Sequence, residues 1–164
     1  MDKNRYELYL EMAKQTHQDP NTWRGTNLRD HHIDAINDLI KQQGIKTILD
    51  YGCGKAHYHQ KDWNATLYDP AVPEYSNEPT GKFDLVICTD VLEHIPEEDI
   101  PRIVQQLKDL TQGWLYISVC PRLAKQKLKV PNSNEEVNSH VCVKPPEWWR
   151  EQIQGDKIIL KFTD

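Results

Sequence analysis

The residues around position 50 are the first whose types and spacing could do chemistry. Asp50 directly precedes a turn that contains Gly52, Cys53 and Gly54, while His57 holds the place of the third glycine of a dinucleotide-binding pattern. Glycines allow a tight turn and a close approach of a ligand to the main chain. A carboxylate here suits an ammonium group better than a pyrophosphate. An ordinary tight turn explains the same residues when they are taken alone.

A second acidic residue, Asp69, follows Asp50 by 19 positions and is itself followed by Pro70. This spacing is close to the roughly 20 residues at which a carboxylate can bind the ribose hydroxyls of a nucleoside. An Asp-Pro turn is the alternative interpretation. The two acidic positions together favour a nucleoside site.

A third motif begins with the apolar run 83–89, which leads directly into Thr89, Asp90 and Val91 and then into His94. A nearly continuous apolar run is typical of a parallel strand that is buried on both faces. The polar residues after it are expected at the edge where a cofactor or a substrate binds. The alternative is an ordinary loop between a strand and a helix.

These motifs need a sheet to bring them together, and strand and helix patterns alternate along the chain. The expected strands are 45–51, 65–68, 83–89, 114–119 and 157–162, and the expected helices are 4–16, 27–43, 55–63, 96–111 and 145–154. The stretches 71–82 and 121–138 are expected to be loops. This order predicts an α/β protein, a three-layer α/β/α sandwich with a mostly parallel sheet. Ligands then bind at the carboxyl ends of the strands.

The chain has 164 residues and a net charge of -5, which suits one domain over 1–164. Within it we expect N-terminal helices in 1–44, a cofactor-binding core in 45–120 and a variable region in 121–164. The sequence has no apolar run long enough for a membrane helix and no apolar leader, so we expect a cytoplasmic protein without membrane contact. The four cysteines are expected to be buried thiols, and no ligand spacing predicts a metal.

The three motifs together, TILDYGCG, YDP and FDLVICTDVLEHIPEE, resemble the class I S-adenosylmethionine (SAM) dependent methyltransferases. The D-V-L-E-H form is similar to the branch that includes ubiquinone-biosynthesis O-methyltransferases. The resemblance covers about residues 45–120. The segment 140–149 is similar to short methyltransferase-like proteins carried by bacteriophages, which implies the cytoplasm of a host cell.

The resemblance implies a Rossmann-like fold, SAM as cofactor and methyl transfer by in-line displacement at the sulfonium. It places Asp50, Gly52 and Gly54 around the methionine part of SAM, Asp69 at its ribose and Val91 beside it. The residues expected at the cofactor are Asp50, Gly52, Cys53, Gly54, Asp69, Pro70, Thr89, Asp90, Val91, Arg24 and Gly25. The residues expected to act as a base in catalysis are His94, His140 and Asp90.

Only 13 residues separate Asp69 from Phe83, too few for the helix and strand that a full family member has there. We therefore expect a reduced sheet of five strands, whose exposed edge a second copy of the chain could cover as a homodimer. A methyltransferase acting on a small molecule or on another acceptor, such as the end of a modest polymer, is the leading interpretation. The alternatives are a catalytically reduced protein that binds SAM or a protein partner, and a nucleic-acid methyltransferase. Net acidity disfavours tight, sequence-blind nucleic-acid binding but does not exclude a specific partner.

Overall fold

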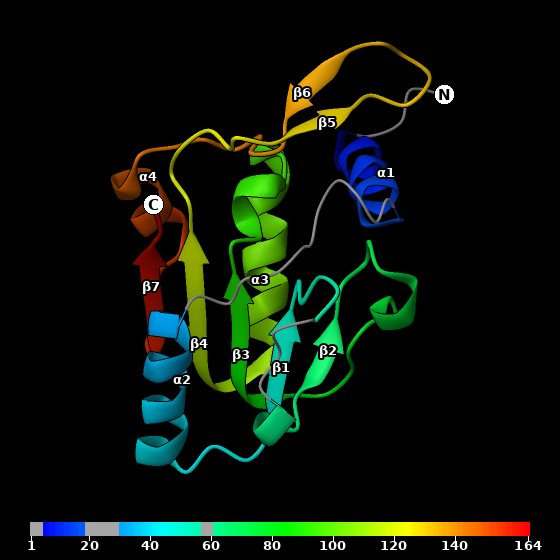
Figure 1. Ribbon diagram of the computed structural model, residues 1–164. Coiled ribbons are helices and arrows are strands. Elements are labelled where there is room, and N and C mark those ends of the chain that lie inside the picture. Colours follow the sequence, from blue (N-terminus) through cyan, green and yellow to red (C-terminus); the bar gives the residue numbers. More distant parts are fainter. Residues whose placement is uncertain (1–4, 19–29, 57–60) are drawn as a thin grey trace.

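Five parallel strands form the centre of the protein, as the computed structural model shows for residues 5–18, 30–56 and 61–164 (Figure 1). Their order across the sheet is β2-β1-β3-β4-β7. The strand bounds are β1 Ile48–Tyr51, β2 Thr66–Tyr68, β3 Phe83–Thr89, β4 Thr111–Val119 and β7 Ile158–Phe162. The expectation of a reduced, parallel five-stranded sheet is therefore confirmed. Because all five strands run the same way, their carboxyl ends meet at one edge.

One face of the sheet is covered by α2, Asp30–Gln43. Ile36 and Leu39 of this helix pack against Leu85 and Ile87 of β3 and against Tyr116 of β4. These strand residues alternate with residues that point to the opposite face, as the two-residue period of a strand requires.

The other face is covered by α3, Ile100–Leu110, and by α4, Pro146–Gln152. In α3 the apolar residues recur at helical spacing, so that Ile103 and Leu107 are both buried against the sheet. Trp149 of α4 is fully buried in the same cluster, with Trp148 packed beside it. Helices therefore lie on both faces, and the three-layer prediction holds.

Two further elements lie above the carboxyl edge of the sheet. They are α1, Arg5–Gln18, and a hairpin of two short antiparallel strands, β5 Lys127–Lys129 and β6 Glu136–Asn138 (Figure 1). The helix packs against β5. The prediction that 121–138 is a plain loop is wrong over this hairpin. Its strands are only three residues long, too short to give a clear alternating pattern.

The helix predicted over 55–63 is also not found in the part that the structure describes. Lys55 and Ala56 form a turn, and Ala56 has a positive φ of 51°. Lys61–Trp63 forms one 3-10 turn. The segment between β2 and β3 carries a single 3-10 turn, Pro73–Tyr75, in agreement with its short length. No helix among the described residues is long and apolar enough to span a membrane.

Candidate functional site

The turn after β1 packs tightly against β2 and against the loop after β3. The N–H groups of Gly52 and Cys53 both donate to the carbonyl of Tyr68, at 2.7 and 3.1 Å. Gly52 has a φ of +80°, and a Cβ added to it would lie 2.3 Å from Cγ2 of Val91. A side chain at this position would therefore clash with the loop after β3. Glycine is required both by the backbone conformation and by this close approach.

Asp69, at the end of β2, fixes the same turn from the other side. Its Oδ2 accepts the N–H of Gly54 at 2.8 Å, and its Oδ1 accepts the N–H of Ala71 at 2.8 Å. The side chain is buried, and it lines the cavity described below together with Pro70. The motifs around Asp50 and Asp69 are thus joined by a direct hydrogen bond.

Asp50 sits beside this pair at the end of β1. Burial, and to a smaller extent the negative charge of Asp69, together raise the pKa of its carboxyl to about 7. Both effects disfavour a second negative charge in a confined space. A cation bound here would oppose both effects, because it would lower the pKa of Asp50 and favour the ionised carboxylate.

The loop after β3 ties together the ends of three strands. Asp90 has a positive φ of 53°, and its N–H donates to the carbonyl of Ser118 at 3.0 Å. Its Oδ1 accepts the hydroxyl protons of Ser118 and Thr163, at 2.9 and 3.0 Å. Asp90 therefore fixes β3, β4 and β7 at their carboxyl ends, besides lining the cavity.

His94 and His140 face each other with their rings 4.8 Å apart in an edge-to-face arrangement. Nδ1 of His94 donates to the carbonyl of Ser139 at 2.8 Å, which leaves the lone pair on Nε2. Burial, and to a smaller extent the neighbouring His140, together lower the pKa of His94 to about 4. His94 is therefore a neutral imidazole at pH 7.

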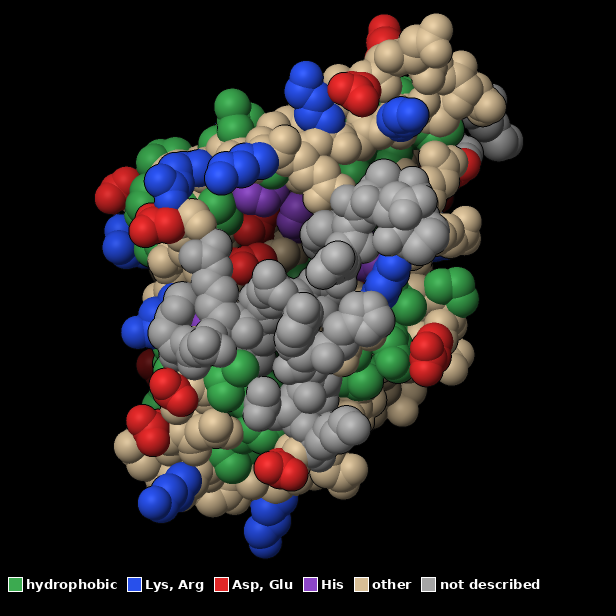
Figure 2. Space-filling model, viewed as in Figure 1, with side chains coloured by type: hydrophobic (Ala, Val, Ile, Leu, Met, Phe, Trp, Pro, Cys, Tyr) green, Lys and Arg blue, Asp and Glu red, His purple; other side chains and the backbone are tan. Residues whose placement is uncertain are grey.

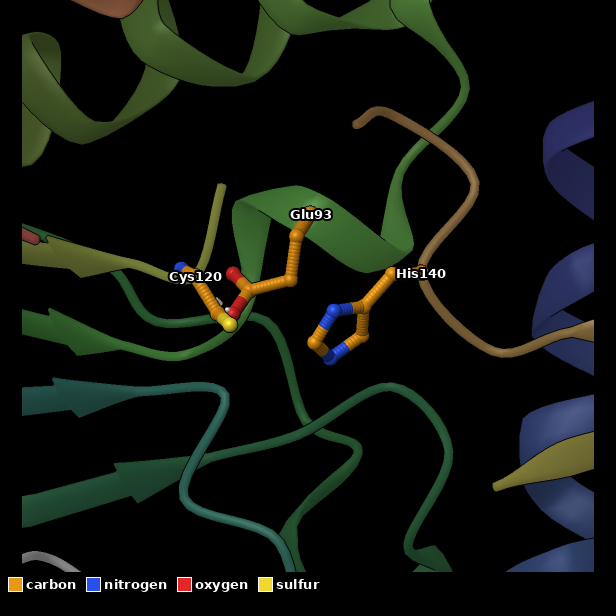
Figure 3. A group of neighbouring side chains, drawn as sticks. All are labelled: Glu93, Cys120 and His140. Atoms are coloured by element: carbon orange, nitrogen blue, oxygen red, sulfur yellow. Dashed lines mark hydrogen bonds between the residues drawn. The ribbon is translucent and has the colours of Figure 1, made fainter. Parts of the chain in front are cut away.

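The structure adds Glu93 to the site, a residue that the sequence motifs did not identify as a site residue. Glu93 is fully buried, and its Oε1 accepts the N–H of Cys120 at 2.9 Å. Side-chain atoms of Glu93, Cys120 and His140 all lie within 4.8 Å of one another (Figure 3). In the sequence Glu93 directly precedes His94, which was predicted as a site residue, and this adjacency could have identified Glu93.

The acidic, histidine and cysteine residues of these motifs line one cavity of about 1070 Å³ at the carboxyl edge of the sheet. Its floor is the strand ends, and α1 and the β5–β6 hairpin form its roof. Figure 2 shows histidine and acidic side chains gathered in a recess below the hairpin, with Lys and Arg side chains at its rim. Arg122 and Lys125 of the hairpin segment and His17 of α1 also line the cavity, and sequence patterns did not predict them as site residues. This volume exceeds the roughly 300–1,000 Å³ of a typical ligand pocket, so it has room for a cofactor and a second molecule.

Negative charge is concentrated on the inner wall of this cavity. The pKa of the buried Cys88 thiol is raised well above its ordinary value, first by burial and then by the charges of Glu93, Asp50 and Asp90. Three carboxylates, which follow or end strands β1 and β3, are therefore all close enough to Cys88 to raise its pKa. A wall of this kind suits a cationic ligand.

The predicted site residues that fall in the described ranges are brought together at this cavity. The cavity lining includes Asp50, Gly52, Cys53, Gly54, Asp69, Pro70, Thr89, Asp90, Val91, His94 and His140. Arg24 and Gly25 lie outside the described residues. Their roles stay predictions, because the lining shows position and not function.

A parallel sheet, a glycine turn after its first strand and a carboxylate after its second are typical of the class of α/β domains that bind nucleoside cofactors. A family model described as a methyltransferase domain matches residues 16–155. The chain therefore belongs to the methyltransferase domain family, and its fold is the Rossmann-like fold of the class I SAM-dependent methyltransferases.

A more specific comparison covers less of the chain. The chain is similar to the magnesium-protoporphyrin O-methyltransferase of Synechocystis sp. (strain ATCC 27184 / PCC 6803 / Kazusa), with 36% identity over 58 residues. This match covers 29% of the chain and 25% of the relative, so the chain aligns with about a quarter of that protein's length. No solved structure matches the chain.

Proposed function

We propose that the protein binds SAM in the cavity at the carboxyl edge of the sheet and transfers its methyl group to a small-molecule acceptor. The observation that carries this proposal is the junction of β1 and β2, where the Gly52 turn and the carboxylates of Asp50 and Asp69 line one cavity. Membership of the methyltransferase domain family also supports SAM as the cofactor, since SAM is the methyl donor that the family implies.

The residues present fit this cofactor at two of its ends. Asp50 lies where a carboxylate would meet the α-ammonium, and binding of that cation would lower its raised pKa. Because Gly52 has no side chain, its turn packs directly against Val91 of the loop after β3, and both segments line the cavity. Asp69 is held by the N–H groups of Gly54 and Ala71, and each of its oxygens has a second lone pair for a ribose hydroxyl.

Bound SAM supplies an electrophilic methyl group, and the chain itself would contribute orientation and exclusion of water. The roof of α1 and the hairpin covers one side of the cavity and lowers its exposure to solvent. His94 presents a neutral imidazole to this space, and we propose that it accepts the proton of the acceptor. We propose that Asp90 positions the loop, because Ser118 and Thr163 both donate to its Oδ1.

A second function is supported by the segment between β2 and β3. This segment contains only the 3-10 turn Pro73–Tyr75, so the residues that would clasp adenine in a full family member have no helix or strand to carry them. A protein that binds SAM without transferring its methyl group is therefore the alternative. Nothing among the described residues favours the nucleic-acid interpretation over these two.

Transfer of a labelled methyl group from SAM into a cell extract distinguishes these functions. We expect label in the small-molecule fraction, and label in RNA, DNA or protein would contradict the proposed acceptor class. Binding of SAM with no label in any fraction would support the binding protein. An Asp69→Ala variant is expected to lose most affinity for SAM, and unchanged affinity would contradict the ribose role. Its thermal unfolding is measured in parallel, because Asp69 also holds the turn.

A further inference from the structure

The cluster of Glu93, Cys120 and His140 unites three donor types from three separate segments. Glu93 belongs to the 3-10 turn Leu92–His94, Cys120 directly follows β4, and His140 lies between β6 and α4. Their carboxylate, thiol and imidazole atoms lie within 4.8 Å of one another, and all three residues line the cavity (Figure 3).

Hydrogen bonds hold the side chains of Glu93 and His140 and the backbone of Cys120. Oε1 of Glu93 accepts the N–H of Cys120 at 2.9 Å. The carbonyl of Glu93 accepts the N–H groups of Val141 and Cys142, at 2.8 and 3.0 Å, and so holds the chain next to His140 in place. Nδ1 of His140 donates to the carbonyl of Arg122, which leaves the lone pair on Nε2. A backbone carbonyl behind one ring nitrogen is the usual support of a metal-binding histidine.

We propose that Glu93, Cys120 and His140 bind one Zn²⁺ ion in the wall of the cavity. A thiolate, an imidazole and a carboxylate together favour zinc over magnesium or calcium, which take oxygen ligands. Ligand atoms of a tetrahedral zinc site lie roughly 3.5 Å apart, so the present separations close by about 1 Å. Cys120 and His140 are only partly buried and can rotate to do this. Binding releases the thiol proton of Cys120 to solvent.

The position of this site in the proposed SAM cavity bears on the chemistry of the methyl acceptor, an inference that rests on the proposed function. With three protein ligands, zinc keeps a fourth position, and all three residues here line the same cavity. An oxygen of the acceptor bound in that position would lose its proton more readily. The acceptor would then be a hydroxyl or carboxylate compound rather than an amine.

The test is metal binding by the full chain after treatment with a chelator. We expect calorimetry to show one Zn²⁺ per chain, and Co²⁺ to give a thiolate-to-cobalt charge-transfer absorption. Cys120→Ser should abolish this absorption and weaken Zn²⁺ binding at least about 100-fold, more than loss of an outer hydrogen bond does. His140→Gln should weaken Zn²⁺ binding to a similar degree. Both positions are partly exposed, so the variants retain the fold even if Glu93→Gln, at a fully buried position, does not.

The matched control is Cys142→Ser, because this buried cysteine is outside the cluster and should leave Zn²⁺ binding unchanged. Absence of Zn²⁺ binding overturns the proposal, as does equal binding by Cys120→Ser and the unaltered chain. Binding of Mg²⁺ in preference to Zn²⁺ also overturns it, because that would exclude the thiolate. Zn²⁺ binding by a chain that does not bind SAM would support the metal site and overturn the proposed function alone.

Discussion

Replacement of Asp50 by Asn should stabilise the protein at pH 8 and leave its stability nearly unchanged at pH 4. The pKa of Asp50 is raised from 3.8 to about 7, mainly because burial disfavours its charge. The folded chain therefore holds this proton more tightly than the unfolded chain, and stability is lost as pH rises from about 4 to about 7. Over about 3 pH units, at about 1.4 kcal/mol each, the loss reaches about 4 kcal/mol.

Urea denaturation of both chains between pH 4 and pH 8 measures this difference in the free energy of unfolding. Asp84→Asn is the control, and its effect on the free energy of unfolding should have the opposite sign. Hydrogen bonds from the N–H groups of Thr47 and Lys46 lower the pKa of Asp84 to about 2, so its charged form stabilises the fold. That variant should be less stable than the unaltered chain at neutral pH. A stability difference for Asp50→Asn that is the same at pH 4 and pH 8 would refute the reasoning.

Two further substitutions test how the site is held. Gly52→Ala should cost at least about 2 kcal/mol, because it strains a positive φ and drives a Cβ into Val91. Gly81→Ala is its control in urea denaturation, since Gly81 also has a positive φ but nothing within 4 Å of the added Cβ, and equal losses would contradict the clash. Ser118→Ala should cost about 1–3 kcal/mol, because it removes a hydroxyl that donates to Asp90. An unchanged unfolding midpoint would show that this bond does not hold the strand ends.

The core of the fold was predictable because its signals are local. The apolar run 83–89 indicates a strand buried on both faces, and the spacing of Ile103 and Leu107 indicates one buried helix face. Both elements occur close to where they were predicted. The hairpin at 127–138 was not predictable, since only Leu128 of β5 is buried and the lysines beside it are exposed. An exposed, three-residue strand leaves almost no pattern in a sequence.

The site was predictable in part for a similar reason. Asp50 and Asp69 were found because their types and spacing are unusual and because strand ends converge. The cluster of Glu93, Cys120 and His140 was not found, because its members are 20 to 47 positions apart and the hairpin crossover brings His140 back over the sheet. Long-range placement of this kind depends on packing and not on local propensity.

Calorimetric titration with SAM and with S-adenosylhomocysteine at pH 8 tests the central claim most directly, with the unaltered chain and Asp50→Asn compared side by side. We predict one site per chain, with binding at least about 10-fold weaker in Asp50→Asn because a charge-assisted contact to the α-ammonium is lost. The variant should bind more weakly although it is the more stable protein, which separates loss of the site from loss of the fold. Absence of binding by the unaltered chain, or equal binding by both, would contradict the claim.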